Sequence, residues 1–147
     1  MGCYVFHKAK LLIVEDEMII AEDIKSILEK NGEYEVSGIA KTGDEALELV
    51  EAHCPDLILM DICLSGDTDG IVTASYIRQT YKVPIVFITA YTDQALLKRV
   101  KKVEPFGYIV KPYTEESIHA NIAIALHNAK SSRSRLREAV NFFHDFK

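Results

Sequence analysis

Short apolar runs that end in or lead into polar residues constrain this chain of 147 residues more than any other feature. The runs cover residues 11–14, 57–60, 85–88 and 108–110, and helical spacing of apolar residues separates them. Runs of this length are typical of parallel strands whose two faces are both covered. In such a sheet the carboxyl ends of the strands meet at one edge, where ligands bind.

The polar residues at the ends of these runs are chemically related. Two carboxylates follow the first run, and a third carboxylate, a hydroxyl and an ammonium follow the other three. In chain order these residues are Glu15, Asp16, Asp61, Thr89 and Lys111. We therefore expect all five at one edge of the sheet. Such a set is suited to holding a divalent metal ion and a phosphoryl group.

Strands and helices alternate along the rest of the chain. Residues 34–40 alternate more weakly and are predicted to form a second strand towards an edge of the sheet. The segment Thr42-Gly43-Asp44-Glu45 has the pattern of a capping box at a helix start. Helices are also predicted after Glu17, from about residue 69, after Asp93 and after Thr114. Five strands and five helices with long crossovers predict an α/β fold with a doubly wound parallel sheet.

Composition fits one globular domain and excludes several classes of protein. The chain is 48% apolar and 27% charged, which is enough to form a sizeable core. Its net charge of −5 predicts no direct nucleic-acid binding. No apolar stretch approaches the ~20 residues that cross a membrane, so no membrane partner is expected. Three cysteines, Cys3, Cys54 and Cys63, lack metal-binding or disulfide spacing, which favours the reducing cytoplasm.

The chain divides into three predicted parts. Residues 1–9 precede the first strand and are interpreted as a leader. Residues 10–130 contain all five strands and form the predicted domain. Residues 131–147 are basic and rich in serine at their start, which favours an extension of the last helix or the beginning of a linker.

The carboxylates predict both metal binding and nucleophilic chemistry. Glu15, Asp16 and Asp61 would repel one another unless a cation lay between them. Mg²⁺ is the natural candidate, because it binds one or two carboxylates together with water and phosphate oxygens. A carboxylate can also attack phosphorus and form an aspartyl phosphate, and Asp61 is the best candidate for that role. Lys111 would neutralise charge on the phosphoryl oxygens, and Thr89 would donate a hydrogen bond.

Four sequence segments resemble the receiver domain of two-component response regulators, the family that includes the bacterial chemotaxis regulator. The segments are LLIVEDE, DLILMDICLSGDTDGI, IVFITAYTD and FGYIVKPY. The resemblance implies a flavodoxin-like (βα)₅ fold with strand order 2-1-3-4-5. It also implies a phosphorylation-activated switch of a phosphorelay, in which Asp61 accepts a phosphoryl group from a sensor histidine kinase or a phosphotransfer protein.

The resemblance further implies roles for individual residues. Mg²⁺ would be bound by Glu15, Asp16, Asp61 and the backbone carbonyl of Cys63. Thr89 and Lys111 match the hydroxyl and the lysine of the family, and Tyr108 matches the aromatic residue that moves when the threonine moves. The face formed by the fourth helix, fifth strand and fifth helix would carry the output, with a homodimer through this face as one possibility.

Other classes of protein with a similar fold would require different residues after the first strand. A Mg²⁺-dependent phosphohydrolase with an aspartyl nucleophile typically has an Asp-x-Asp pair after the first strand, and this chain has Glu15-Asp16-Glu17 there. A nucleotide or flavin site would need small residues at that position to bind phosphate. A receiver-like interaction module and a receiver fragment of a hybrid histidine kinase stay open. The chain alone would catalyse only its own phosphorylation and dephosphorylation, so the term enzyme fits it weakly.

Overall fold

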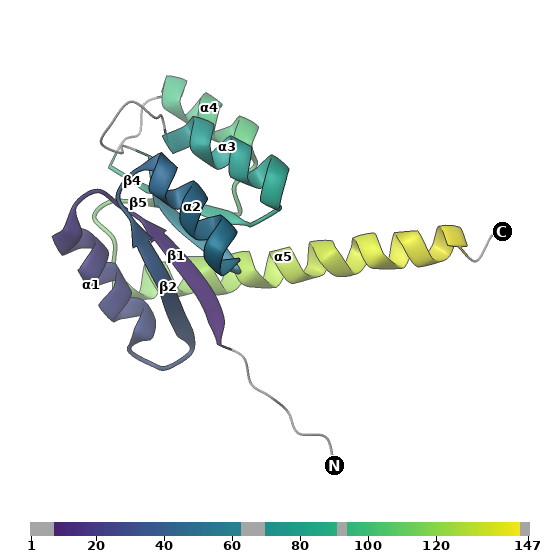
Figure 1. Cartoon of the computed structure of the whole chain (residues 1–147), viewed down its shortest axis with the longest axis horizontal. Coiled ribbons are helices and arrows are strands. Elements are labelled where there is room, and N and C mark those ends of the chain that lie inside the picture. The colour runs from purple at the N-terminus through teal and green to yellow at the C-terminus, as the bar shows by residue number, and fades with distance from the viewer. Residues whose placement is uncertain (1–7, 63–69, 91–93, 145–147) are drawn as a thin grey trace, which may run out of the picture.

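A computed structural model describes residues 8–62, 70–90 and 94–144, with backbone alone at 132–139 and 141–144 (Figure 1). Strands and helices alternate along the chain, as the sequence predicts. The strands are β1 (Ala9–Val14), β2 (Tyr34–Ala40), β3 (Leu57–Asp61), β4 (Ile85–Thr89) and β5 (Gly107–Val110). The helices are α1 (Met18–Glu29), α2 (Gly43–His53), α3 (Gly70–Tyr81), α4 (Gln94–Val103) and α5 (Glu115–His144).

The five strands form one parallel sheet of order β2-β1-β3-β4-β5. This order confirms the flavodoxin-like fold that the resemblance implies. The strand with the weakest apolar pattern, β2, lies at an edge. Its pairing with β1 is interrupted between Leu11 and Leu12, where the register shifts past Ser37. A register shift of this kind is common at sheet edges, where one strand has no second neighbour to hold it.

Helices cover both faces of the sheet and create two separate apolar cores (Figure 1). On one face, α1 and α5 pack against Leu11 and Ile13 of β1. On the other face, α2, α3 and α4 pack against Leu12 and Val14 of the same strand. Because successive side chains of a strand point to opposite faces, an unbroken apolar run serves both cores. The central strands are therefore fixed from both sides.

The start of α2 shows a variant of the predicted capping box. The Thr42 hydroxyl accepts a hydrogen bond from the Glu45 backbone N–H at 3.2 Å, as expected for an N-cap. The Glu45 carboxylate accepts from the backbone N–H of Lys41 at 2.8 Å, one residue earlier than the usual box. At the other end Cys54 adopts a left-handed conformation with φ of 46°, just before Pro55.

The last helix is much longer than the domain requires. α5 contacts the core through Ile118, Ile122 and Ala125, and its second half projects beyond the sheet in Figure 1. The helix continues through residues 131–144. The division of the chain at residue 130 stays a prediction. Most of the predicted leader, residues 1–9, lies outside the part of the chain that the structure describes. Within that part, none of the helices combines the length and the apolar character needed to cross a membrane.

Ile58 and Ile19 test whether the two-sided core holds the sheet together. Ile58 is completely buried in β3, whereas the side chain of Ile19 in α1 is 87% exposed. We expect Ile58→Ala to lower the free energy of unfolding by about 2–5 kcal/mol, since it removes buried contacts and leaves a cavity. Ile19→Ala should change it by no more than about 0.5 kcal/mol. Urea denaturation measures both, and a similar loss in the two variants would contradict the assignment of the core.

Candidate phosphoacceptor site

The strand ends bring the predicted residues to one edge of the sheet. Val14 pairs with Met60, so Glu15 and Asp61 follow at equivalent positions on neighbouring strands. Asp61 in turn pairs with Ile88, which places Thr89 one residue further along the next strand. The position of Glu15 is fixed by a hydrogen bond from its backbone N–H to the carbonyl oxygen of Ala40 at 2.9 Å. The apolar register of the strands therefore sets the geometry of the polar edge.

Three carboxylates meet at this edge. One oxygen from each of Glu15, Asp16 and Asp61 lies within 4.8 Å of the others. Glu15 is 1% exposed and Asp61 is 5% exposed, while Asp16 is half-buried. Buried carboxylates this close together repel one another and lose hydration, so the cluster favours a proton or a cation between its members.

Lys111 supplies a positive charge to the cluster from the end of β5. Its ammonium lies 3.1 Å from Oδ2 of Asp61 and 3.9 Å from Oε2 of Glu15. The backbone N–H of Lys111 donates a hydrogen bond to the carbonyl oxygen of Thr89 at 2.8 Å, and this bond fixes the position of the lysine backbone. The following Lys111–Pro112 peptide bond is cis. One ammonium thus contacts two of the three carboxylates.

The pKa values of this cluster reflect burial and crowding. Burial, together with the neighbouring Asp61 carboxyl, raises the pKa of Glu15 from 4.5 to about 8. Burial alone would lower the pKa of Lys111, but the hydrogen bond and charge of Asp61 and the charge of Glu15 raise it overall. At neutral pH the protein without a metal ion therefore favours a protonated Glu15 and a charged Lys111.

Thr89 and Tyr108 lie on the neighbouring strands β4 and β5. Thr89 is completely buried at the end of β4. Tyr108 pairs with Phe87 across the two strands, is half-buried and packs against the core beneath α2, α3 and α4. Burial raises the pKa of the Tyr108 hydroxyl. The two residues thus occupy neighbouring strands between the acidic cluster and the α4–β5 side of the domain.

Two further contacts that the sequence analysis did not predict support the site. The Tyr113 hydroxyl donates a hydrogen bond to Oδ2 of Asp23 at 2.8 Å, which ties the loop after β5 to α1. Burial and this bond raise the pKa of Tyr113 to about 12. The backbone N–H of Glu17 donates to Oε1 of Glu15 at 3.2 Å and orients that carboxylate. The first contact joins residues 90 positions apart, so no local pattern predicts it, whereas the second is local and joins residues two positions apart.

The residues present fit a divalent metal ion. Oε2 of Glu15 is buried and has no hydrogen-bond partner, although it lies within the carboxylate cluster. A buried acceptor without a partner is costly, and a cation would satisfy it. An all-oxygen set with more than one carboxylate is the kind of site that Mg²⁺ prefers. The predicted fourth ligand, the backbone carbonyl of Cys63, lies outside the described residues.

Comparison with known proteins identifies the family. Residues 11–123 match the family described as the response regulator receiver domain. The chain belongs to this family. The match includes β2 to β5, most of β1 and most of the residues that the sequence pattern placed in one domain. The prediction of a receiver domain from the sequence is thereby confirmed.

Similar proteins are regulators of several kinds. The receiver domain is 37% identical over 129 residues to the transcriptional regulatory protein PdtaR of Mycobacterium tuberculosis, with 88% of this chain and 58% of PdtaR covered. It is 36% identical to the phyllosphere-induced regulator PhyR of Methylorubrum extorquens, with 86% and 46% covered. The chain thus spans about half the length of these curated relatives.

Solved structures agree with the fold. The signal receiver domain of a modulated diguanylate cyclase from Desulfovibrio desulfuricans superimposes with a TM-score of 0.80 at 36% identity. That comparison covers 86% of this chain and 99% of the other. Receiver domains generally bind Mg²⁺ at an acidic cluster, and this chain has a candidate cluster. They also interact with histidine kinases or phosphotransfer proteins.

The raised pKa of Glu15 predicts how stability depends on pH. A carboxyl whose pKa is higher in the folded than in the unfolded chain stabilises the fold below about pH 4.5, and this contribution is lost as pH rises through about 8. We therefore expect the free energy of unfolding in EDTA to decrease over this range. Glu15→Gln should flatten the decrease, because the amide cannot ionise.

Urea denaturation at several pH values in EDTA measures this difference. Glu22→Gln, at an exposed position of α1, provides the matched control and should leave the slope unchanged. An identical slope in the wild type and in Glu15→Gln would show that Glu15 is not the group responsible.

Proposed function

We propose that this receiver domain is a phosphorylation-activated switch that accepts a phosphoryl group on Asp61. The donor would be a phosphohistidine of a sensor histidine kinase or a phosphotransfer protein. The observation that carries this proposal is a buried carboxylate at the end of the central strand, held 3.1 Å from a lysine ammonium within an acidic cluster. Asp61 is the central member of the cluster, because its strand lies between β1 and β4.

The proposed transfer requires one bond to form and one to break. An oxygen of the Asp61 carboxylate attacks the phosphorus atom of the donor, and a phosphorus–oxygen bond forms. The phosphorus–nitrogen bond to the donor imidazole breaks, and its electron pair stays on the nitrogen. Lys111, placed at the same edge, would neutralise negative charge on the phosphoryl oxygens. Water attack on the acyl phosphate would later release inorganic phosphate and restore the carboxylate.

Mg²⁺ would be held by Glu15, Asp16 and Asp61, with the carbonyl oxygen of Cys63 as the further ligand implied by the family resemblance. When bound, the ion supplies positive charge to the phosphoryl oxygens and offsets the repulsion between carboxylates. Oε2 of Glu15, which has no hydrogen-bond partner, and the all-oxygen cluster support this assignment. Lys111 alone contributes too little positive charge for three carboxylates and an incoming phosphoryl group.

A partner protein would dock beside the acidic cluster. Three apolar side chains near the site are exposed: Met18 (42%), Ile19 (87%) and Val110 (43%). Met18 and Ile19 begin α1 directly after the Asp16 segment, and Val110 precedes Lys111. Apolar side chains around a charged centre are typical of a surface that another protein covers. This arrangement supports a protein rather than a small molecule as the physiological donor.

Phosphorylation would be signalled through Thr89 and Tyr108. An acyl phosphate on Asp61 carries about two negative charges where the carboxylate carried one, and it offers several acceptor oxygens, so it can draw a nearby hydroxyl towards it. Movement of the buried Thr89 would leave space that Tyr108 can enter, and this would alter the surface of α4, β5 and α5. Exposed Lys98 and Lys101 on α4 and Glu116 on α5 offer opposite charges for a homodimer through this surface.

We further propose that the switch acts in the cytoplasm and makes no direct contact with nucleic acid. The net charge of −5 supports the second point, because nucleic-acid affinity depends on neutralising phosphates with basic groups. Cys54 is an exposed free thiol, which fits a reducing compartment.

Intact mass after incubation with acetyl phosphate and Mg²⁺ tests the phosphoacceptor. We expect the wild-type chain to gain one phosphoryl group, and Asp61→Asn to gain none, because the amide is a poor nucleophile. Asp44→Asn, at an exposed position in the first turn of α2, should be phosphorylated like the wild type. EDTA should abolish the adduct in both. Phosphorylation of Asp61→Asn to the wild-type level would move the site to another residue.

The pKa of Glu15 also predicts a proton release on metal binding. At pH 7 this carboxyl is mostly protonated without a metal ion, since its pKa is about 8. Ligation requires the carboxylate, so Mg²⁺ binding should release protons. Calorimetric titration in two buffers of different ionisation enthalpy measures the number released. Glu15→Gln should release fewer, and an enthalpy independent of buffer in the wild type would contradict Glu15 as a ligand.

A further inference from the structure

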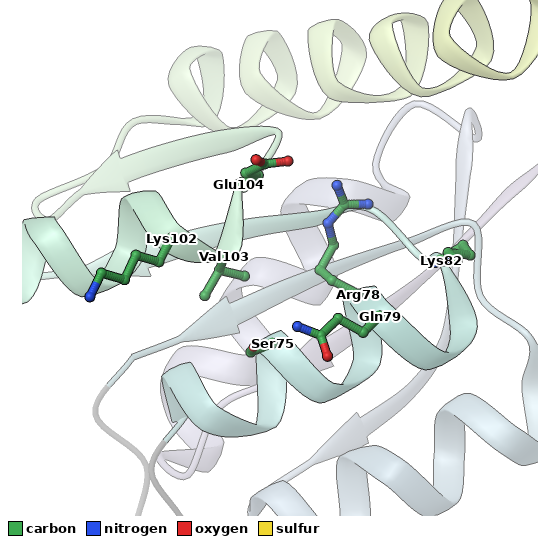
Figure 2. A pocket seen from close by; sticks show the side chains of 7 residues that line it. All are labelled: Ser75, Arg78, Gln79, Lys82, Lys102, Val103 and Glu104. Carbon is green, nitrogen blue, oxygen red and sulfur yellow. The ribbon is translucent and has the colours of Figure 1, made fainter. Parts of the chain in front are cut away.

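A cavity of about 340 Å³ lies between the ends of α3 and α4, away from the acidic cluster. Its polar lining is formed by Ser75, Arg78, Gln79, Lys82, Lys102 and Glu104 (Figure 2). In a parallel α/β fold the helices end at the sheet edge where the strands begin. The cavity therefore lies at the edge opposite to Asp61, and the proposed phosphoryl transfer does not use it.

Arg78 packs against Phe106, and one of its donors has no hydrogen-bond partner. The guanidinium lies over the ring of Phe106, 4.9 Å from the ring centroid, which fixes its plane. Nε of Arg78 is buried and has no hydrogen-bond partner. Burial lowers the pKa of Arg78, although the nearby charge of Glu104 opposes this shift. A guanidinium that lines a cavity and keeps an unused donor suits an oxyanion.

The cavity also has a positive charge. Lys82 and Lys102 line it with Arg78, and neither lysine forms an ion pair with a described residue. Glu104 and the partial negative charges at the two helix ends offset about two of these three cations. About one positive charge remains, which favours an anion. Lys102 points outwards in Figure 2, so it contributes positive potential at the rim.

Lys82 and Glu104, which line the cavity, have a left-handed backbone conformation. Each residue follows the last residue of its helix, and their φ angles are +59° and +56°. Glycine is preferred at such left-handed positions, because a side chain there costs about 1–2 kcal/mol. Both positions nevertheless have a charged side chain. Cys54 has the same conformation at the end of α2, outside the cavity.

We propose that this cavity binds a small phosphate monoester that carries hydroxyl groups, such as a sugar phosphate. The phosphate would contact Arg78 and Lys82, since a guanidinium fork and an ammonium both suit phosphate oxygens. The hydroxyl groups would contact Gln79 and Glu104. A nucleobase is disfavoured, because the ring of Phe106 is already covered by Arg78. The volume is at the lower end of the range for small-molecule sites.

Amide chemical shifts of the full chain in EDTA, titrated with α-glucose 1-phosphate, test this proposal. We expect saturable shifts at Ser75, Gln79 and Glu104, with a dissociation constant below about 10 mM. Arg78→Gln should weaken binding about tenfold or more, because it removes a charge-assisted hydrogen bond. Glucose without the phosphate should not bind, and inorganic phosphate should bind more weakly than the ester.

Lys82→Gly separates loss of the ligand contact from loss of the fold. Glycine relieves the left-handed strain, so the melting temperature should stay equal or rise while binding weakens several-fold. Cys54→Gly makes the same backbone change at the end of α2, outside the cavity, and should bind like the wild type. Absence of saturable shifts, shifts confined to the Asp61 edge, or unchanged affinity in Arg78→Gln and Lys82→Gly would overturn the site. Equal affinity for inorganic phosphate would overturn the hydroxyl contacts.

Discussion

The close approach of Glu15 and Asp61 at the buried end of the sheet is the constraint on which the site depends. Two carboxylates that have lost most of their hydration cannot both be charged without a nearby cation. Lys111 contacts both and compensates for part of this cost, and the raised pKa of Glu15 shows that compensation is incomplete. The cluster is therefore unstable by itself and well suited to bind a cation and then a phosphoryl group.

This unfavourable arrangement persists because the apolar core fixes the strands. Leu12 and Ile13 of β1 and Ile58 and Leu59 of β3 are buried on both faces of the sheet, and their pairing sets where the next polar residues lie. A shift of one residue would move every apolar side chain to the opposite core. The favourable burial of many side chains thus outweighs the electrostatic cost at one edge. Stability and reactivity come from different parts of the same strands.

The sequence predicted those features that depend on local pattern. Apolar runs located the strands, and the residues that follow them located the acidic edge, because parallel strands share a direction. Features that depend on tertiary distance were not predictable. The bond between Tyr113 and Asp23 joins segments far apart in the chain, and the stacking of Arg78 on Phe106 requires α3 to lie beside the start of β5. No spacing rule relates such residues before the fold is known.

The two edges of the sheet carry opposite charges, which the net charge of the chain conceals. At the carboxyl ends of the strands, three carboxylates surround one lysine, and the edge requires a cation. At the opposite edge, Arg78, Lys82 and Lys102 outnumber Glu104, which favours an anion in the proposed site. The same β4 and β5 run between the two edges, so each site is anchored to the same rigid core. The net charge of the chain does not reveal these two groups, because the fold gathers acidic side chains at one edge and basic side chains at the other.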